Sequence, residues 1–184
     1  MESPRRLRLL AALFDRDGTL VRDVPYNGDP ALVRAMPHAG DVLRRLRGLG
    51  LRTGILTNQS GVSRGLLTPA QVDAVNGRVE ELLGPFDVWE VCFHGPEDSC
   101  LCRKPAPGMI LNACRRLGVE PGQTAYIGDI GTDVEAATRA GSWGILVPTA
   151  VTLEGEIAAA ATVARDLEGA FKLIVEAIGQ EDRQ

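Results

Sequence analysis

The sequence predicts an α/β protein with a Rossmann-like, three-layer α/β/α fold, in which helices cover both faces of a mostly parallel sheet. The first observation is that short, nearly continuous apolar runs alternate with segments of helical periodicity. Strands of this kind are buried on both faces, which is typical of parallel sheets connected by helices. The second observation is that polar residues suited to chemistry follow each of the first four apolar runs. Ligands of such sheets bind at the carboxyl ends of the strands, so both observations favour the same fold.

Six apolar runs are rich enough in β-forming residues to predict strands. They lie at Leu9–Phe14, Arg52–Leu56, Val88–Phe93, Thr124–Ile127, Gly144–Val147 and, with the weakest pattern, Thr162–Ala164.

Helical periodicity predicts five helices between and after these strands. They lie at Gly40–Leu49, Pro69–Leu83, Gly108–Leu117, Asp133–Ala140 and Leu167–Ile178. Two capping boxes, in which the cap residue and the residue three positions on bond each other's free amides, are expected at Thr68–Gln71 and Thr132–Glu135. Pro69 suits the first helical position of the former. Glycine is expected to end three of the helices, at Gly84, Gly118 and Gly141.

Length and composition suit one domain over residues 1–184, in which residues 179–184 are expected to form a frayed tail. The net charge of −4 gives no electrostatic reason to expect nucleic acid or an acidic membrane surface as a partner. No segment approaches the roughly 20 apolar residues that span a bilayer. The apolar run near the N-terminus leads directly into charged residues, unlike a signal peptide. We therefore expect a cytoplasmic protein without nucleic-acid or membrane partners, and a monomer is favoured.

The ends of the first four predicted strands carry the residues best suited to chemistry. Asp15 and Asp17 follow the first strand, Thr57 the second, Lys104 the third and Asp129 the fourth. Nearby carboxylates suit Mg²⁺, and a buried cluster of like charges is hard to tolerate without a cation. A lysine and a hydroxyl donor suit phosphoryl oxygens. Taken singly, these residues are typical of a solvated turn, a surface lysine or a strand-end cap; together they favour a phosphate site.

A second cluster combines three cysteines and one histidine in eleven residues. The ligand set would be Cys92, His94, Cys100 and Cys102. Three thiolates and an imidazole match a closed tetrahedral zinc site, which favours a structural Zn²⁺ over a catalytic one. The alternative is free thiols beside a histidine that is there by chance. Such a site would fix the loop that carries Arg103 and Lys104, whereas Cys114 is expected to be a small buried residue of a helix.

Four segments, "DRDGTL", "TNQSG", "CRKPAPGM" and "IGDIGTDVEAA", resemble the four motifs of the haloacid dehalogenase (HAD) superfamily of phosphohydrolases, in the same order. They extend from residue 13 to about residue 141. The resemblance implies a HAD-like fold in which Asp15 attacks phosphorus and forms an aspartyl-phosphate. Asp17 would protonate the leaving alkoxide and then accept a proton from water. Thr57 and Lys104 would stabilise the transferring phosphoryl group.

The same resemblance implies a catalytic Mg²⁺ held by Asp15, by the backbone carbonyl of Asp17 and by Asp129. Asp133 would support these ligands without a direct bond to the metal. The enzyme would thus be a Mg²⁺-dependent phosphatase of a small phosphorylated metabolite.

The Cys-x-His and Cys-x-Cys-Arg-Lys-Pro pattern is similar to one HAD branch, that of the heptose 1,7-bisphosphate and histidinol-phosphate phosphatases. This resemblance favours a sugar bisphosphate as substrate, with histidinol phosphate as the alternative. Residues at the substrate-contacting positions are Asp23, Tyr26, Thr57, Asn58, Gln59, Ser60, Arg64, Arg103 and Lys104. For Tyr26 a loop anchor, and for Arg64 a solvated charge, are the competing interpretations.

One residue departs from the heptose-phosphatase pattern: Ile130 stands where a lysine usually helps to hold the substrate. The intervals from Asp15 to Thr57 and from Thr57 to Lys104, about 40 and 45 residues, leave no room for an inserted cap domain. Residues 22–36 and the zinc loop are therefore expected to select the substrate. Two other functions remain open, a phosphotransferase using the same intermediate and a catalytically idle binding protein, although the latter would be expected to lack one of the motif residues.

Overall fold

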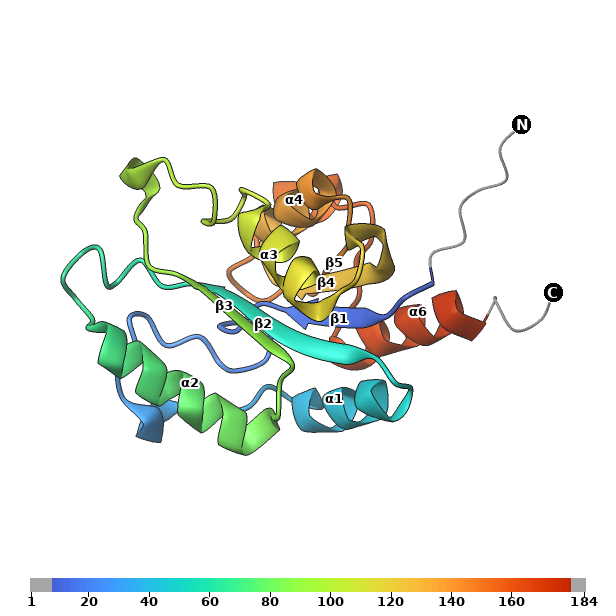
Figure 1. Ribbon diagram of the computed structural model, residues 1–184, viewed down its shortest axis with the longest axis horizontal. Helices are drawn as coiled ribbons and strands as arrows, with labels where there is room; N and C mark the ends of the chain where they lie inside the picture. The colour runs from blue at the N-terminus through green and yellow to red at the C-terminus, as the bar shows by residue number, and fades with distance from the viewer. Residues whose placement is uncertain (1–7, 180–184) are drawn as a thin grey trace.

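The computed structural model describes residues 8–179 and contains one five-stranded parallel sheet (Figure 1). The order of the strands is β3-β2-β1-β4-β5, and every neighbouring pair is parallel. Their bounds are β1 Ala11–Phe14, β2 Arg52–Asn58, β3 Val88–Cys92, β4 Thr124–Gly128 and β5 Trp143–Leu146. The central strand β1 is entirely buried, as its continuous apolar sequence predicts.

In the described part of the chain, six α-helices connect and cover the strands. They are α1 Ala39–Gly48, α2 Pro69–Leu83, α3 Gly108–Leu117, α4 Gly131–Ala140, α5 Glu154–Ala159 and α6 Leu167–Gly179, with short 3₁₀ turns at Pro30–Leu32, Pro96–Asp98 and Pro121–Gln123. Helices α1, α2 and α6 lie on one side of the sheet and α3 and α4 on the other (Figure 1). The predicted three-layer α/β/α fold is therefore confirmed.

Each face of the sheet has its own apolar core. The side covered by α1, α2 and α6 buries residues such as Phe14, Leu43 and Ile174. The opposite side packs Leu13 and Tyr126 of the sheet against α3 and α4. Alternation of Leu13 and Phe14 between the two cores follows from the two-residue period of a strand. Two packed faces hold the strands in place, and this gives the carboxyl edge of the sheet a rigid base.

The predicted helix ends are correct at most positions. Thr68 and Gln71 form the expected capping box at the start of α2, with Pro69 in the first turn. The capping box predicted at Thr132–Glu135 is wrong, because α4 begins earlier, at Gly131. The carboxylate of Asp133 accepts the backbone N–H of Ile130 at 3.2 Å and takes the capping role.

The sixth predicted strand is also wrong as a full element. Within the described residues, Thr162–Ala164 contributes only an isolated bridge between Val163 and Leu146. The segment is too short to form a ladder at the edge of the sheet. Helix α5 was not predicted, because its six residues carry too little periodicity. The tail expected from residue 179 does not begin there, because Gly179 is the last residue of α6. The rest of the expected tail, residues 180–184, lies outside the described part of the chain.

Among residues 8–179, no helix is both long and apolar enough to cross a membrane.

Candidate active site

The carboxyl edge of the sheet brings together residues that are far apart in the sequence. Strand β1 lies between β2 and β4, so the ends of these three strands are neighbours. Asp15 directly follows β1, and Asp129 directly follows β4. Thr57 lies one residue before the end of β2, which is longer than the sequence predicted. The predicted clustering of strand-end polar residues is therefore observed.

Lys104 occupies the centre of this edge. Its Nζ lies 2.6 Å from Asp15 Oδ1 and 2.7 Å from Asp133 Oδ1. The same atom donates to the hydroxyl of Tyr126 at 2.9 Å and to the carbonyl of Leu56 at 3.2 Å. Lys104 is only 5% exposed, so burial alone would lower its pKa. The carboxylates of Asp133 and Asp15 outweigh that effect and raise the pKa of Lys104 well above its usual value.

Three buried carboxylates surround this single ammonium group. Oxygens of Asp15, Asp129 and Asp133 all lie within 4.8 Å of one another. Burial raises the pKa of Asp129 to about 7, with a further increase from Asp133. Burial also raises the pKa of Asp15, and the neighbouring carboxylates add to this despite the attraction of Lys104. One ammonium cannot neutralise three carboxylates, so the cluster holds protons or requires a further cation.

Glycine permits the close approach of these carboxylates to the backbone. Gly18 has a φ of +82°, and a Cβ at this position would lie 2.2 Å from Asp129 Oδ2. A Cβ at Gly128 would lie 2.3 Å from both Cβ and Cγ of Asp133. Any larger residue at either position would displace a carboxylate of the cluster.

The carboxylate of Asp17 does not belong to this cluster and has hydrogen-bond partners of its own. The guanidinium of Arg16 donates from Nη2 to Asp17 Oδ2 at 2.8 Å, and from Nε to both carboxylate oxygens at 3.1 Å. Gln59 Nε2 donates to Asp17 Oδ2 and to Thr57 Oγ1, each at 2.9 Å. Arg16 is only 2% exposed. Arg16 was not predicted as a site residue, although a basic residue between two acids at the end of a buried strand indicates a possible role in the site.

A pocket of about 340 Å³ lies over these residues. Its lining consists of Asp15, Arg16, Asp17, Asp23, Val24, Pro25, Tyr26, Asn27, Thr57, Asn58, Gln59, Ser60, Gly61, Lys104, Asp129, Ile130 and Val151. The loop after β1, the end of β2 and the start of α4 thus surround one cavity. This pocket includes all but two of the residues predicted to bind substrate.

The two exceptions are Arg64 and Arg103, which do not contribute to the lining of the pocket. Arg64 Nη1 donates to the hydroxyl of Tyr26 at 2.9 Å, and its guanidinium lies 5.9 Å from the centre of the Tyr26 ring. Arg103 Nη1 donates to the carbonyl of His94 at 3.3 Å. Arg64 therefore contacts the pocket through Tyr26, while Arg103 contacts the cysteine-containing loop.

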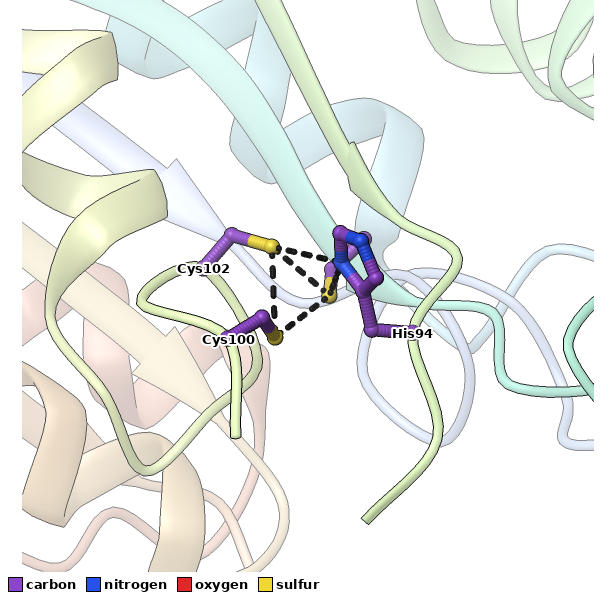
Figure 2. Close-up of side chains that lie close together, drawn as sticks. His94, Cys100 and Cys102 are labelled. Atoms are coloured by element: carbon purple, nitrogen blue, oxygen red, sulfur yellow. Dashed lines mark hydrogen bonds between the residues drawn. The ribbon is translucent and has the colours of Figure 1, made fainter. Parts of the chain in front are cut away.

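The predicted zinc ligands converge in space (Figure 2). Donor atoms of Cys92, His94, Cys100 and Cys102 lie within 4.8 Å of one another. Cys102 Sγ lies 3.0 Å from Cys92 Sγ and 3.5 Å from Cys100 Sγ, and 3.2 Å from His94 Nδ1. Burial raises the pKa of the Cys92 thiol. Cys114, by contrast, is buried in α3, as predicted.

The sulfur cluster and the lysine cluster are joined by a short piece of backbone. The backbone N–H of Arg103 donates to Cys100 Sγ at 3.3 Å. The next residue is Lys104, whose backbone N–H donates to Asn58 Oδ1 at 3.2 Å. The loop is therefore held at the sulfur cluster on one side and at the end of β2 on the other.

Both clusters have the donor chemistry of a metal site. Three buried carboxylates with one opposing cation offer the oxygen ligands that Mg²⁺ prefers. Three sulfurs and one imidazole nitrogen offer the set typical of structural Zn²⁺.

Fold and pocket position define an α/β protein whose ligand site lies at the carboxyl edge of a parallel sheet. The haloacid dehalogenase-like hydrolase family model matches residues 29–141, and the chain belongs to this family. The HAD resemblance of the sequence motifs and the expectation of a hydrolase are therefore confirmed.

The names of individual relatives indicate a narrower class of phosphatase. The chain is 34% identical over 142 residues to the D-glycero-beta-D-manno-heptose-1,7-bisphosphate 7-phosphatase of Bordetella bronchiseptica, covering 74% of this chain and 79% of the relative. The corresponding Pseudomonas aeruginosa protein is 35% identical over 142 residues, covering 74% and 80%. A crystal structure of the B. bronchiseptica D,D-heptose 1.7-bisphosphate phosphatase complexed with magnesium and phosphate superposes with a TM-score of 0.80 and 29% identity, covering 90% of this chain and 98% of the other.

Proposed function

We propose that this protein is a Mg²⁺-dependent phosphatase that removes one phosphate from a small phosphorylated sugar. The first candidate substrate is heptose 1,7-bisphosphate, because this compound appears in the names of the relatives. The observation that carries the proposal is the 2.6 Å contact between Lys104 Nζ and Asp15 Oδ1. Two more buried carboxylates lie beside this contact, and both of its residues line the same polar pocket. A nucleophilic carboxylate, a cation for phosphoryl oxygens and space for a substrate are thus in one place.

In the proposed reaction, a carboxylate oxygen of Asp15 attacks phosphorus, and the bond from phosphorus to the sugar oxygen breaks. Asp17 gives its proton to the leaving alkoxide, which departs as an alcohol. A water molecule then attacks the aspartyl-phosphate and gives a proton to Asp17, which releases inorganic phosphate and restores Asp15. Thr57 and Lys104 stabilise the phosphoryl oxygens as charge develops on them.

Asp15, Asp129 and the backbone carbonyl of Asp17 are the proposed Mg²⁺ ligands, and Asp133 supports them through its contact with Lys104. When bound, Mg²⁺ supplies positive charge that offsets the carboxylates and the phosphate. Cys92, His94, Cys100 and Cys102 would hold Zn²⁺ in a structural role.

The pocket residues supply hydrogen bonds for a polyhydroxylated substrate. Asp23, Tyr26, Asn58, Gln59 and Ser60 all line the cavity, and their donors and acceptors suit sugar hydroxyls. Arg64 and Arg103 would act at its margin, where each is held by a neighbour. Ile130, in the place of the expected lysine, contributes an apolar part of the lining.

We further propose that the chain forms a single domain without a cap, so that the loops around the pocket select the substrate. A monomeric cytoplasmic enzyme remains our prediction.

Phosphate release from a panel of phosphorylated metabolites, with and without Mg²⁺, tests the proposal directly. The panel contains heptose 1,7-bisphosphate and histidinol phosphate. We expect Mg²⁺-dependent release with the heptose compound as the best substrate. Capture of phosphate by an added alcohol instead of water would indicate a phosphotransferase. Absence of release from every member would contradict the proposed function.

A further inference from the structure

The Asp17 carboxylate is held by a chain of hydrogen bonds that extends to helix α2. Arg16 connects the two, since its Nη2 and Nε donate to Asp17 while its Nη1 donates to Asn76 Oδ1 at 2.6 Å. Asn76 lies in the second turn of α2 and does not contribute to the pocket lining. Because Arg16 is only 2% exposed, its guanidinium has no solvent-facing alternative to these partners.

The contacts are unequal at the two oxygens of Asp17. Oδ2 accepts from Arg16 Nη2 at 2.8 Å, from Gln59 Nε2 at 2.9 Å and from Arg16 Nε at 3.1 Å. Oδ1 shares only the Nε contact, at 3.1 Å. Each carboxylate oxygen offers about two lone-pair sites to hydrogen-bond donors. Oδ1 therefore keeps a site free for a further hydrogen bond, whereas the sites of Oδ2 are taken by Arg16 and Gln59.

We propose that Arg16 and Asn76 are positioning residues that present Oδ1 of Asp17 to the leaving group. The inference rests on the proposed phosphatase function, in which Asp17 protonates the departing alkoxide. Asn76 fixes the plane of the guanidinium, the guanidinium fixes the plane of the carboxylate, and Gln59 links that carboxylate to Thr57. Neither Arg16 nor Asn76 needs to touch the substrate for this effect.

Leaving-group chemistry separates this role from a purely structural one. An alkoxide is a poor leaving group and needs a proton from Asp17, whereas p-nitrophenolate leaves without one. Benzyl phosphate, an alkyl ester, and p-nitrophenyl phosphate, an aryl ester, are both monoesters that carry one aromatic ring, and they differ strongly in this respect. Their kcat/KM values report the steps up to transfer of the phosphoryl group to Asp15 and exclude the later hydrolysis of the aspartyl-phosphate.

The experiment compares Asn76→Ala with the wild-type protein on the two esters. Since general acid catalysis contributes about 10²- to 10⁴-fold, loss of part of its alignment is expected to lower kcat/KM for benzyl phosphate about 10-fold. The kcat/KM for p-nitrophenyl phosphate should change less than about twofold. Asn112→Ala is the matched control, because Asn112 is also a helical asparagine with a side-chain hydrogen bond, to Glu90, and lies outside the pocket lining. It should leave both values unchanged.

Equal losses on both esters, or no loss on either, would overturn the positioning role. Arg16→Ala provides a second test, in which millimolar guanidinium should restore hydrolysis of benzyl phosphate by filling the vacated site. Failure of guanidinium to restore activity in a folded Arg16→Ala protein would also contradict the proposal. If the wild-type protein releases phosphate from neither ester and from no member of the metabolite panel, the proposed phosphatase function fails, and this result is distinct from a failure of the positioning role alone.

Discussion

The two clusters of candidate metal ligands in this protein differ in how they are supported. The carboxylate cluster lies at the ends of buried strands, and Lys104 already provides it with one internal cation. The Cys/His cluster has only Cys92, the last residue of β3, in the sheet, and its other three members lie in the loop that follows. Cys92 is buried, Cys100 and Cys102 are half-buried and His94 is exposed. The carboxylates are thus positioned by the sheet, whereas the zinc ligands would depend on their metal for their mutual position. We expect changes in the first cluster to abolish chemistry and changes in the second to loosen the loop that carries Lys104.

The largest effect is expected at the carboxylate cluster. Asp15→Asn removes the proposed nucleophile while keeping its shape, so phosphate release should fall at least about 1,000-fold. The melting temperature should not fall, because three buried carboxylates face one ammonium group and the substitution removes one of these carboxylates. Asp73→Asn, on the exposed side of α2, is the control and should retain full activity. Release at a near wild-type rate by Asp15→Asn would rule out Asp15 as the nucleophile.

The second effect concerns the Cys/His cluster. Cys102→Ser should abolish binding of Zn²⁺, measured by elemental analysis of protein purified without chelators. Since a displacement of about 1 Å can cost about 100-fold in rate, loosening of the Arg103–Lys104 loop should lower kcat by about 10- to 100-fold. Cys114→Ala, which removes a buried thiol away from the cluster, should keep its zinc. Wild-type protein that contains no zinc would contradict the assignment.

The third effect is a pH dependence of the carboxylate cluster. The raised pKa values of Asp129, about 7, and of Asp15 mean that the folded, metal-free protein binds more protons than the unfolded chain between about pH 4 and pH 7. Its stability should therefore decrease as the pH rises through this range, and Mg²⁺ must displace protons to bind at the lower end. Mg²⁺ affinity, measured by calorimetry, should be at least about 10-fold weaker near pH 6 than near pH 8. Equal affinities would show that protons and Mg²⁺ do not compete.

The smallest effect is expected at the residue between the clusters. Arg103→Gln leaves the backbone N–H that faces Cys100 Sγ and removes the guanidinium that donates to His94 and that we propose acts at the margin of the pocket. KM for a sugar phosphate should rise about fivefold, with zinc content and kcat unchanged. Loss of zinc in this variant would indicate that the Arg103 side chain, through its contact with His94, supports the metal site.

The sequence predicted the sheet well because each strand of a parallel sheet carries its own apolar signature. The clustering at the strand ends followed from topology alone, and the motif residues indicated which side chains matter. Arg16 and Asn76 were not identified because their contact joins residues 60 positions apart in the chain. The early start of α4 was missed for a related reason. The local sequence allows either Thr132 or Asp133 to cap the helix, and the position of the buried Asp133 carboxylate decides between them.

The ammonium group of Lys104 affects the order in which the protein folds and binds its metal ion. Because a covalently attached cation already sits among the carboxylates, the chain can complete its sheet before any divalent ion arrives. In the proposed enzyme, Mg²⁺ would then exchange reversibly with its surroundings, as a dissociable activator whose supply sets the active fraction of the protein. The fold would thus form without a divalent ion, while the activity would depend on the local concentration of Mg²⁺.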